Sequence, residues 1–428
     1  MIDYVEATAK ILENIDVLEA EEKSISKCYG QILAEDIYSD IDVPLADASA
    51  LDGYAVRSEE MKNASRENPV RLHVVETVIA GHLPHKTVQP GTAIRIMTGA
   101  VMPSGADCMI RFEDTSASDE AGNPRPEPLS EVAVFAPVKA GDNVRKAGEN
   151  ITRGAMVLPR GATVGPAEIA VLTSIGKSRI RVTRRPVMAI LASGEEIISL
   201  DKPLSPGKSY DSNTAAITAL VTHYGGIPKI LGVARDSEKS VSAKIQKGMT
   251  ADAIVSSGGV SKGDYDLIRD IITKTGRIVF SGVRISPGTP FSFGMVDSSS
   301  QKSKRVPFFA LAGNPTACML NFELFVRPAI LKMRGLQEFG HNLVEAVISE
   351  PVSNKKELQS FIWIKLEREG DEYRAKLAGA QKRGVLTSVT NADGLAIIPE
   401  NTNFRVGETV KVIMLNWHEG SFFSTPFD

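Results

Sequence analysis

Cysteine is scarce in this chain: Cys28, Cys108 and Cys318 are the three cysteines among 428 residues. They lie far apart, without the close pairs that structural zinc sites use, and they are too few to form a disulfide framework for a chain of this length. Few and scattered thiols are typical of proteins in a reducing compartment. We therefore expect a cytoplasmic protein that folds without disulfides.

Long apolar runs and an excess of one charge are also lacking. No apolar stretch reaches the roughly 20 residues that a membrane-spanning helix needs. The first residues include Asp3 and Glu6, where a signal peptide would be basic. The chain has 49 lysines and arginines against 52 aspartates and glutamates, so its formal net charge is −3. That balance provides no basic surface for nucleic acid or for an anionic membrane, and we expect neither partner.

The pattern of apolar residues changes along the chain, which indicates several domains. A chain of 428 residues is long enough for about three or four of them. The first thirty residues have a helical spacing of apolar side chains, at Ala7, Ile11, Ile15 and Leu18. Residues 41–146 contain short alternating runs cut by glycine and proline, which predicts an antiparallel β module.

Residues 184–335 carry the clearest pattern. Apolar strands alternate there with helical segments; the strands are residues 187–191, 230–234, 253–255, 278–280 and 308–311. This alternation predicts a parallel sheet wrapped by helices. We expect helices to begin at Ser212 or Asn213, at Ser237, and at Asn314 followed by Pro315. After about residue 341, short strand-like runs return and predict a small C-terminal β domain.

Polar loops follow four of these strands, at the edge of the sheet where ligands of such folds bind. The loops are Ser193-Gly194-Glu195-Glu196, Arg235-Asp236-Ser237, the segment from Ser256 to Asp266, and Gly313-Asn314-Pro315-Thr316. Because the carboxyl ends of parallel strands meet at one edge, we expect Glu196, Asp236 and Asp266 to lie together. Carboxylates gathered beside a bound anion need a cation such as Mg²⁺ between them.

The strongest chemical signal is the segment Ser256-Ser257-Gly258-Gly259-Val260-Ser261-Lys262-Gly263-Asp264-Tyr265-Asp266. Two adjacent glycines let a ligand approach the backbone, and consecutive N–H groups can surround a phosphate. Asp264 and Asp266 follow closely enough to hold a divalent cation against that anion. The alternative is a tight turn whose aspartates cap the next helix. The accompanying loops favour the phosphate site.

Two motifs in the β module place polar groups at turns. Asp52 and Gly53 form one of them, and Thr98 and Gly99 form the other. A plain hairpin explains either motif by itself. The sequence contains no Ser-His-Asp elbow and no activated cysteine, so we do not expect a side-chain nucleophile.

Six motifs that occur in order along the chain resemble the molybdopterin molybdenumtransferase family, which includes the C-terminal domain of gephyrin. They are Ser49-Ala50-Leu51-Asp52-Gly53-Tyr54-Ala55, Arg95-Ile96-Met97-Thr98-Gly99-Ala100, Gly148-Glu149-Asn150-Ile151, Ser193-Gly194-Glu195-Glu196, Ser256-Ser257-Gly258-Gly259-Val260-Ser261 and Gly313-Asn314-Pro315. The resemblance covers essentially the whole chain. It implies a multidomain α/β plus β fold with four parts. These are a discontinuous connector domain (residues 1–40 and 147–182), an elongated β module (41–146), a parallel α/β molybdopterin-binding domain (183–335) and a C-terminal β barrel (336–428).

The resemblance also implies a reaction and a site. Adenylylated molybdopterin and molybdate would be the substrates, AMP would be released, and Mg²⁺ would hold the pyrophosphate. The active site would lie between the subunits of an elongated homodimer, and the adenylylating enzyme of the pathway is a candidate partner. The implied catalytic residues are Asp52 and Thr98 of one subunit and Glu196, Asp236 and Asp266 of the other, with Asp236 and Asp266 as metal ligands. The implied binding residues are Ser193, Gly194, Ser257, Gly258, Gly259, Gly313, Asn314 and Pro315.

The chain departs from the family pattern at several positions. The family usually has an Ile-Lys-Pro-Gly-Lys-Pro loop whose lysines face the bound anions, and here Ser286 and Thr289 replace both lysines. Asn150 stands where aspartate is common, and Arg383 stands where serine is usual. An arginine-bearing segment is not evident around residues 359–365. Loss of cations weakens oxyanion binding, because charged donors form stronger hydrogen bonds than neutral ones.

The departures leave three interpretations. The first is an active transferase that uses molybdate or prefers tungstate, with Arg284, Lys262 or Arg383 supplying the missing charge. The second is a non-catalytic carrier of molybdopterin or a scaffold for partners. The third, an unrelated nucleotide-binding α/β protein, accounts for the glycine loop but not for the motifs at Asp52 and Thr98.

Overall fold

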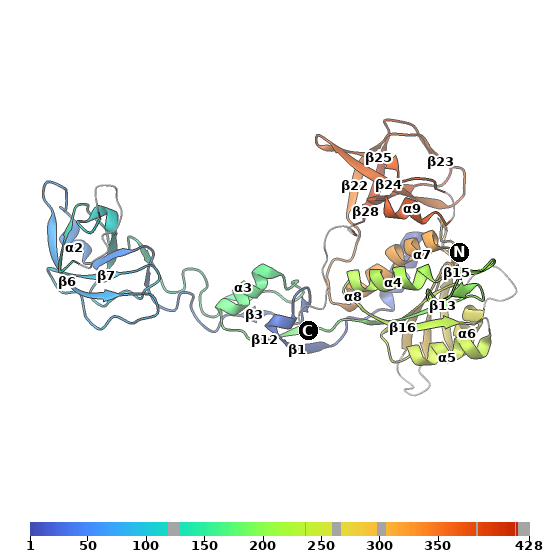
Figure 1. Ribbon diagram of the computed structural model, residues 1–428, viewed down its shortest axis with the longest axis horizontal. Coiled ribbons are helices and arrows are strands. Elements are labelled where there is room, and N and C mark those ends of the chain that lie inside the picture. Colours follow the sequence, from blue (N-terminus) through green and yellow to red (C-terminus); the bar gives the residue numbers. More distant parts are fainter. Residues whose placement is uncertain are drawn as a thin grey trace. The chain divides into compact units, whose positions relative to one another are not determined.

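The computed structural model describes residues 1–118, 129–235, 237–258, 267–297, 305–381, 384–415 and 417. The chain divides into two units, whose elements are labelled in Figure 1. Each unit contains hydrophobic clusters of its own. The first unit contains Met1–Glu35, Gly161–Gly165 and Arg179–Asp428, and the second contains Asp36–Arg160 and Pro166–Ser178. Within the described residues, no helix is long and apolar enough to cross a membrane.

The core of the second unit is a five-stranded sheet with the order β8-β5-β7-β6-β9. Its strands are β5 (Gly53–Val56), β6 (Val70–Val78), β7 (Thr92–Ile96), β8 (Cys108–Arg111) and β9 (Glu131–Val134). Side chains alternate between two apolar clusters: Tyr54 and Val56 belong to one, and Ala55 between them belongs to the other. Both faces of this sheet are therefore buried.

The prediction of an antiparallel β module was wrong for one pair of strands. β6 and β7 run parallel, whereas the other pairs of this sheet are antiparallel. The connection over residues 79–91 is long enough to return the chain to the other end of the sheet, which a tight hairpin cannot do. The remaining elements of the unit are β3 (Ile37–Tyr38), β4 (Ala48–Ser49), α2 (Ser58–Met61), η2 (Phe112–Asp114), β10 (Val144–Arg145), β11 (Met156–Leu158) and α3 (Pro166–Ser174).

The first unit contains a six-stranded sheet with the order β16-β13-β17-β21-β20-β18. Its strands are β13 (Val187–Ser193), β16 (Ile227–Ala234), β17 (Ala253–Ser257), β18 (Gly276–Ser281), β20 (Ser292–Asp297) and β21 (Arg305–Leu311). The predicted parallel arrangement is confirmed for β16, β13, β17 and β21. β18 and β20 are antiparallel additions at one edge, because the unpredicted β20 lies between β18 and β21.

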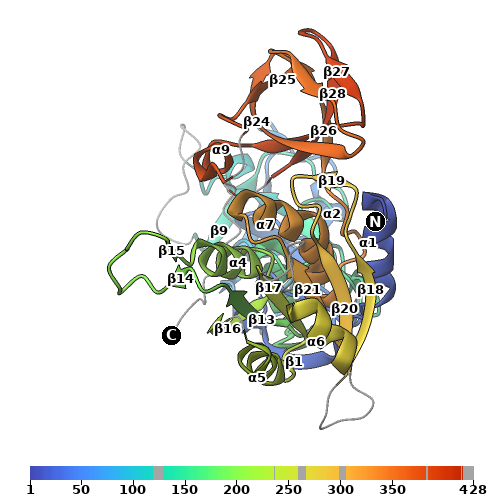
Figure 2. The ribbon, with the colours of Figure 1, turned by 90° about the vertical axis from the view of Figure 1, so that its right-hand side faces the viewer.

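Helices cover both faces of this sheet (Figure 2). They are α4 (Ser212–His223), α5 (Glu238–Gly248), α6 (Leu267–Thr275) and α7 (Pro315–Asn321). Met188 and Ile190 of β13 belong to the apolar cluster that contains α4 and α7. Ala189 and Leu191 belong to the cluster that contains α5 and α6. The alternation of side chains along the strand thus places two helices on each face.

The N-terminal helix is shorter than the apolar spacing predicts. α1 (Tyr4–Glu13) ends at its C-cap Asn14, and the chain then enters β1 (Ala20–Ser24). Ile15 lies beyond the end of the helix but is still buried. It fits the helical spacing of apolar residues because it is buried, although it is not part of the helix. The neighbouring elements are η1 (Ile25–Lys27), β2 (Ile32–Leu33) and β12 (Arg179–Thr183), and β12 pairs with both β1 and β2.

The C-terminal part of the first unit is a closed β barrel, as predicted. Its sheet has the order β19-β24-β25-β22-β28-β26, and a further pairing of β24 with β26 closes the ring. The strands are β19 (Ile285–Ser286), β22 (Leu343–Ile348), β24 (Gln359–Glu369), β25 (Glu372–Leu377), β26 (Gly394–Ile398) and β28 (Thr409–Met414). A π-helical turn, η3 (Phe322–Val326), joins α7 to α8 (Arg327–Met333) before the barrel. The small elements are β14 (Ile197–Ile198), β15 (Ser209–Tyr210), β23 (Val352–Asn354), α9 (Leu386–Thr390) and β27 (Thr402–Phe404).

Candidate active site

The loops at the carboxyl ends of β13, β17 and β21 meet at a pocket of about 200 Å³. This Ser257 pocket is lined by Ala192, Ser193, Glu196, Ile197, Ser209, Tyr210, Asp211, Ser212, Asn213, Ser257, Gly258, Gly313 and Pro315. The lining includes these predicted site residues: Ser193, Glu196, Ser257, Gly258, Gly313 and Pro315. They lie together because parallel strands end at the same edge of a sheet.

Two glycines lie at the Ser257 pocket: Gly258 lines it, and Gly194 follows the lining residue Ser193 in the chain. Gly258 has a φ of +83°, and a Cβ atom there would lie 2.5 Å from the carbonyl oxygen of Ser193. Gly194 has a φ of +154°, and a Cβ atom there would lie 2.5 Å from a carboxylate oxygen of Glu196. The positive φ favours glycine at both positions, and at Gly258 a side chain would also meet the backbone of Ser193, so the lining of the pocket there is bare backbone.

The start of α4 adds polar groups to the pocket. Asp211 is the N-cap, and its carboxylate accepts a hydrogen bond from the N–H of Thr214 at 3.0 Å. The prediction of Ser212 or Asn213 as the cap was wrong, because Asp211 takes this role one residue earlier. Asn213 instead donates its side-chain amide to the carbonyl oxygen of Gly313 at 2.9 Å. Its Oδ1 is buried and has no hydrogen-bond partner among the described residues, so it can accept a hydrogen bond from a ligand.

The other two predicted helix caps are confirmed. Ser237 caps α5 and accepts a hydrogen bond from the N–H of Ser240 at 3.3 Å. Asn314 caps α7, with Pro315 at the first helical position. The Asn314 side chain also accepts a hydrogen bond from the hydroxyl of Thr316 at 2.8 Å.

Two carboxylates, from Glu196 and Asp211, line the Ser257 pocket. The predicted metal ligands Asp236 and Asp266, and the predicted phosphate-binding Gly259, lie outside the described residues. Among the described residues, no group of three or more His, Cys, Asp or Glu side chains could hold a metal ion. Mg²⁺ takes oxygen ligands and is commonly held by one or two carboxylates together with phosphates and water. The carboxylates of this pocket fit that ion bound together with a phosphorylated ligand.

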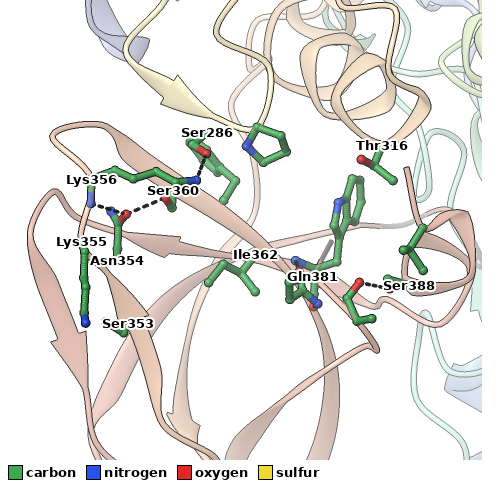
Figure 3. Close-up of a pocket in the computed structure, with 15 residues that line it drawn as sticks. Ser286, Thr316, Ser353, Asn354, Lys355, Lys356, Ser360, Ile362, Gln381 and Ser388 are labelled. Carbon is green, nitrogen blue, oxygen red and sulfur yellow. Dashed lines mark hydrogen bonds between the residues drawn. The ribbon is translucent and has the colours of Figure 1, made fainter. Parts of the chain in front are cut away.

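A second pocket, of about 520 Å³, lies between the barrel and the loop after β19 (Figure 3). This Ser286 pocket is lined by Ser286, Pro287, Thr316, Ser353, Asn354, Lys355, Lys356, Ser360, Phe361, Ile362, Trp363, Ala380, Gln381, Val385 and Ser388. Hydroxyl, amide and ammonium groups predominate among its polar groups. No carboxylate is present among the described residues that line it. Hydrogen-bond donors and positive charge without a competing carboxylate favour an anionic ligand.

Lys356 reaches the position where the first family lysine is missing. Its Nζ donates a hydrogen bond to Oγ of Ser286 at 2.6 Å (Figure 3). The two residues are 70 positions apart in the chain, so no local pattern connects them. Arg284, proposed from the sequence as a substitute, instead forms an ion pair with Glu400 at 2.9 Å. The other proposed substitutes lie outside the described residues: Lys262 and Arg383.

In the second unit, the predicted residues Asp52 and Thr98 are in direct contact. Oδ1 of Asp52 accepts hydrogen bonds from the backbone N–H and from the hydroxyl of Thr98, each at 2.7 Å. Both residues are exposed. Gly53 is required beside them, because a Cβ atom there would lie 1.9 Å from the carbonyl oxygen of Ile110. The two motifs therefore form one exposed feature.

The cysteines are unsuited to nucleophilic chemistry. Cys28, Cys108 and Cys318 are all buried, and burial raises the pKa of each thiol. A thiol that stays protonated is a poor nucleophile.

Three family models match the chain. Residues 2–176 match the MoeA N-terminal region (domain I and II), and residues 189–332 match a probable molybdopterin binding domain. Residues 345–415 match the MoeA C-terminal region (domain IV). Together these matches follow the chain almost from end to end.

Known proteins resemble the chain over nearly its whole length. The molybdopterin molybdenumtransferase of Nostoc sp. is 34% identical over 391 residues, which cover 90% of this chain and 86% of that protein. The molybdopterin molybdenumtransferase of Bacillus subtilis is 33% identical over 407 residues, which cover 94% and 91%. The solved molybdopterin biosynthesis MoeA protein from Pyrococcus horikosii matches with a TM-score of 0.80 and 33% identity, over 97% of this chain and 99% of that chain. The chain belongs to the molybdopterin molybdenumtransferase family.

Proposed function

We propose that this protein is a transferase of molybdenum cofactor biosynthesis that inserts molybdenum from molybdate into adenylylated molybdopterin and releases AMP. The observation that carries the proposal is the Ser257 pocket, where predicted binding residues from three loops of the α/β part line one cavity. Fold alone does not determine chemistry. The proposed reaction is supported by two relatives named molybdopterin molybdenumtransferase, which match across 90% and 94% of the chain.

The Ser257 pocket binds the phosphates and the pterin of the substrate. Gly258 leaves the backbone of the pocket open to close approach, as phosphate binding requires. Ser257 adds a hydroxyl, and the unpartnered Oδ1 of Asn213 accepts a donor of the ligand. Gly259, the next residue in the sequence, is assigned the same role.

Glu196 and Asp211 would hold Mg²⁺ in this pocket, together with Asp236 and Asp266. The ion supplies neutralisation of the charge that develops when the bond between the two phosphates breaks. The protein would contribute by holding the phosphates in one position. The Glu196 carboxylate is suited to hold the ion because it lies close to the backbone at Gly194. Phosphoryl chemistry needs positioning and electrostatic stabilisation more than a protein nucleophile.

Molybdate binds in the Ser286 pocket. Lys356 supplies the positive charge that Ser286 and Thr289 do not provide, through an ammonium group already in place at Ser286. Hydrogen bonds from an ammonium group are roughly twice as strong as those from a neutral donor. Tungstate, an anion of the same shape and charge, is an alternative substrate for this pocket.

The protein acts as a homodimer in the cytoplasm, with Asp52 and Thr98 of one subunit completing the Ser257 pocket of the other. Their exposure leaves them accessible to a partner subunit. The division into domains at residues 1–40 with 147–182, 41–146, 183–335 and 336–428 belongs to the same proposal, with the second of these presenting Asp52. The enzyme that adenylylates molybdopterin is the proposed supplier of the substrate.

A single-turnover assay tests the proposed function. Purified protein is mixed with adenylylated molybdopterin, Mg²⁺ and either molybdate or tungstate, and AMP release is followed together with metal retained on the pterin. We expect both signals with at least one oxyanion, and loss of AMP release after chelation of divalent cations. AMP release that persists after chelation would exclude the proposed role of Mg²⁺.

A non-catalytic carrier or scaffold is the second candidate. The observation that favours it is the replacement of both family lysines by Ser286 and Thr289. This candidate predicts tight binding of molybdopterin without AMP release in the same assay. Any Mg²⁺-dependent release of AMP excludes it.

A further inference from the structure

Trp363 lines the Ser286 pocket with an unused hydrogen-bond donor. Trp363 is 3% exposed, and its indole Nε1 is buried without a hydrogen-bond partner among the described residues. An indole N–H can only donate, and leaving a buried donor unpaired costs free energy. An unpartnered buried donor in a residue that lines a pocket requires an explanation, and a ligand that accepts from it would be one.

The backbone of Trp363 is fixed on both sides. Its N–H donates to Oε1 of Gln381 at 3.2 Å, and Nε2 of Gln381 donates to its carbonyl oxygen at 2.9 Å. Gln381 also lines the Ser286 pocket. In the barrel, Trp363 pairs with Leu395 across β24 and β26. These contacts fix the backbone but not the side chain. Because the indole N–H has no hydrogen-bond partner among the described residues, packing against other side chains sets the position of the ring.

That packing comes from Trp417. The centroids of the two indole rings are 5.8 Å apart, with planes at 47°. Nε1 of Trp417 donates hydrogen bonds to the hydroxyl of Tyr224 at 3.1 Å and to Oε2 of Glu323 at 3.3 Å. Trp417 is thus held at its polar end while its ring supports Trp363.

Glu323 anchors this arrangement from within the π-helical turn η3. Its residue is 1% exposed, and its carboxylate accepts from the Tyr224 hydroxyl at 2.7 Å. Arg327 lies 3.4 Å from the same carboxylate, and its guanidinium also donates to the carbonyl oxygen of Gly340 at the entry to the barrel. The Glu323 carboxylate is therefore linked to Trp417 directly and to Gly340 through Arg327. Gly340 lies just before β22 of the barrel, and Trp417 lies just after β28.

We propose that Trp363 is a binding residue of the Ser286 pocket, which donates its indole N–H to the bound oxyanion. Glu323 acts as a positioning residue, because it holds Trp417 and through it the ring of Trp363. The inference rests on the proposed function for the identity of the anion.

The chemistry of the pocket selects a small oxyanion. Lys356 brings an ammonium group, Ser286 brings a hydroxyl, and Trp363 brings a neutral donor. A tetrahedral dianion offers acceptor oxygens to all of these donors, and its negative charge compensates the ammonium group, which a neutral ligand does not do.

Replacement of Trp363 by phenylalanine tests the donor. The variant Trp363→Phe keeps an aromatic ring and removes the N–H, and we expect its Kd for sodium molybdate, measured by titration calorimetry on the full chain, to rise about tenfold. Ser349→Ala is the matched control, because Oγ of Ser349 is a buried and unpartnered atom of the same barrel that does not line the pocket. Equal affinity in Trp363→Phe and wild type overturns the proposal.

Fluorescence supplies a second measurement, because the chain has 2 tryptophans. In Trp417→Phe the remaining indole is Trp363, and its emission should change with molybdate and saturate at the Kd that calorimetry gives for the same variant. In Trp363→Phe the remaining indole is Trp417, and the change should be several-fold smaller. No response in Trp417→Phe under molybdate concentrations that saturate binding overturns the proposal.

The positioning role has its own readout. In the AMP-release assay, Trp417→Phe and Glu323→Gln should raise the KM for molybdate about threefold and leave kcat unchanged. A lower melting temperature with an unchanged KM would show a structural role only, and overturns this part. If wild type releases AMP and Trp363→Phe has the same KM, the proposed function stands and this inference fails. If wild type releases no AMP and binds no molybdate, both fail.

Discussion

Oδ1 of Asp52 accepts two hydrogen bonds from one residue, from the backbone N–H and from the hydroxyl of Thr98, each at 2.7 Å. The sequence places these residues 46 positions apart, in two motifs that a plain hairpin could explain separately. The antiparallel pairing of β5 with β7 brings them together. The carboxylate is therefore oriented before any substrate arrives.

An oriented carboxylate should matter for catalysis more than for stability. We expect Asp52→Ala to lower the rate of AMP release about a hundredfold, within the range of a positioned acid–base group. Because Asp52 is exposed, the free energy of unfolding should change by less than about 1 kcal/mol. Asp47→Ala is the control, since Asp47 is another carboxylate of this unit, held by Lys146 at 2.8 Å. Full activity in Asp52→Ala would contradict the proposed role.

Gly258 should tolerate no side chain. Alanine at position 258 would lower the stability because the φ there is positive, which alanine rarely adopts. Its Cβ would also lie 2.5 Å from the carbonyl oxygen of Ser193. Gly207 has nearly the same φ, +80°, but no atom lies within 4 Å of a Cβ built there, so Gly207→Ala isolates the backbone cost. By urea denaturation we expect a loss of about 1 kcal/mol for Gly207→Ala and about 3 kcal/mol for Gly258→Ala. Equal losses would show that the contact with Ser193 relaxes.

Lys356 should determine oxyanion affinity. Lys356→Met removes the ammonium group at Ser286 and keeps most of the side-chain volume, and we expect the KM for molybdate to rise about tenfold or more. Lys376→Met is the control, because Lys376 pairs with Glu367 on the barrel and does not line the Ser286 pocket. If both variants keep the wild-type KM, Lys356 is not the replacement for the missing lysines.

His341 should make the fold sensitive to mild acid. Burial lowers its pKa from 6.5 to about 4, with a further contribution from Arg327. Below pH 6.5 the unfolded chain takes up a proton that the folded chain does not, so the free energy of unfolding falls as the pH falls towards 4. Between pH 7 and pH 5 this amounts to about 2 kcal/mol.

The measurement is urea denaturation of wild type and His341→Gln at several pH values between 7 and 5. The difference between the two profiles should shrink as the pH falls, because glutamine does not titrate. An exposed control, His82→Gln, should follow the wild-type profile. Parallel profiles for wild type and His341→Gln would contradict the lowered pKa.

Local patterns were sufficient for much of this protein. Proline and the side-chain oxygens of Ser237 and Asn314 act within one turn of chain, so the starts of α5 and α7 follow from sequence. The apolar runs predicted five strands, and parallel strands must end at one edge, which brought Ser193, Ser257 and Gly313 to one pocket. The start of α4 was misplaced because Asp211 and its neighbours are all good caps, and the choice depends on packing.

The tertiary structure alone decided which distant groups meet. Lys356 and Ser286 are 70 residues apart, and Trp417 and Glu323 are 94 apart. Each contact depends on how the barrel packs against the α/β part. The periodicity of apolar residues along the chain does not predict that packing. Sequence therefore determined the family, the strands and the loop chemistry, since these depend on neighbours in the chain. The cation and the indole of the second pocket depend on contacts between separate elements, which form only when the whole first unit is folded.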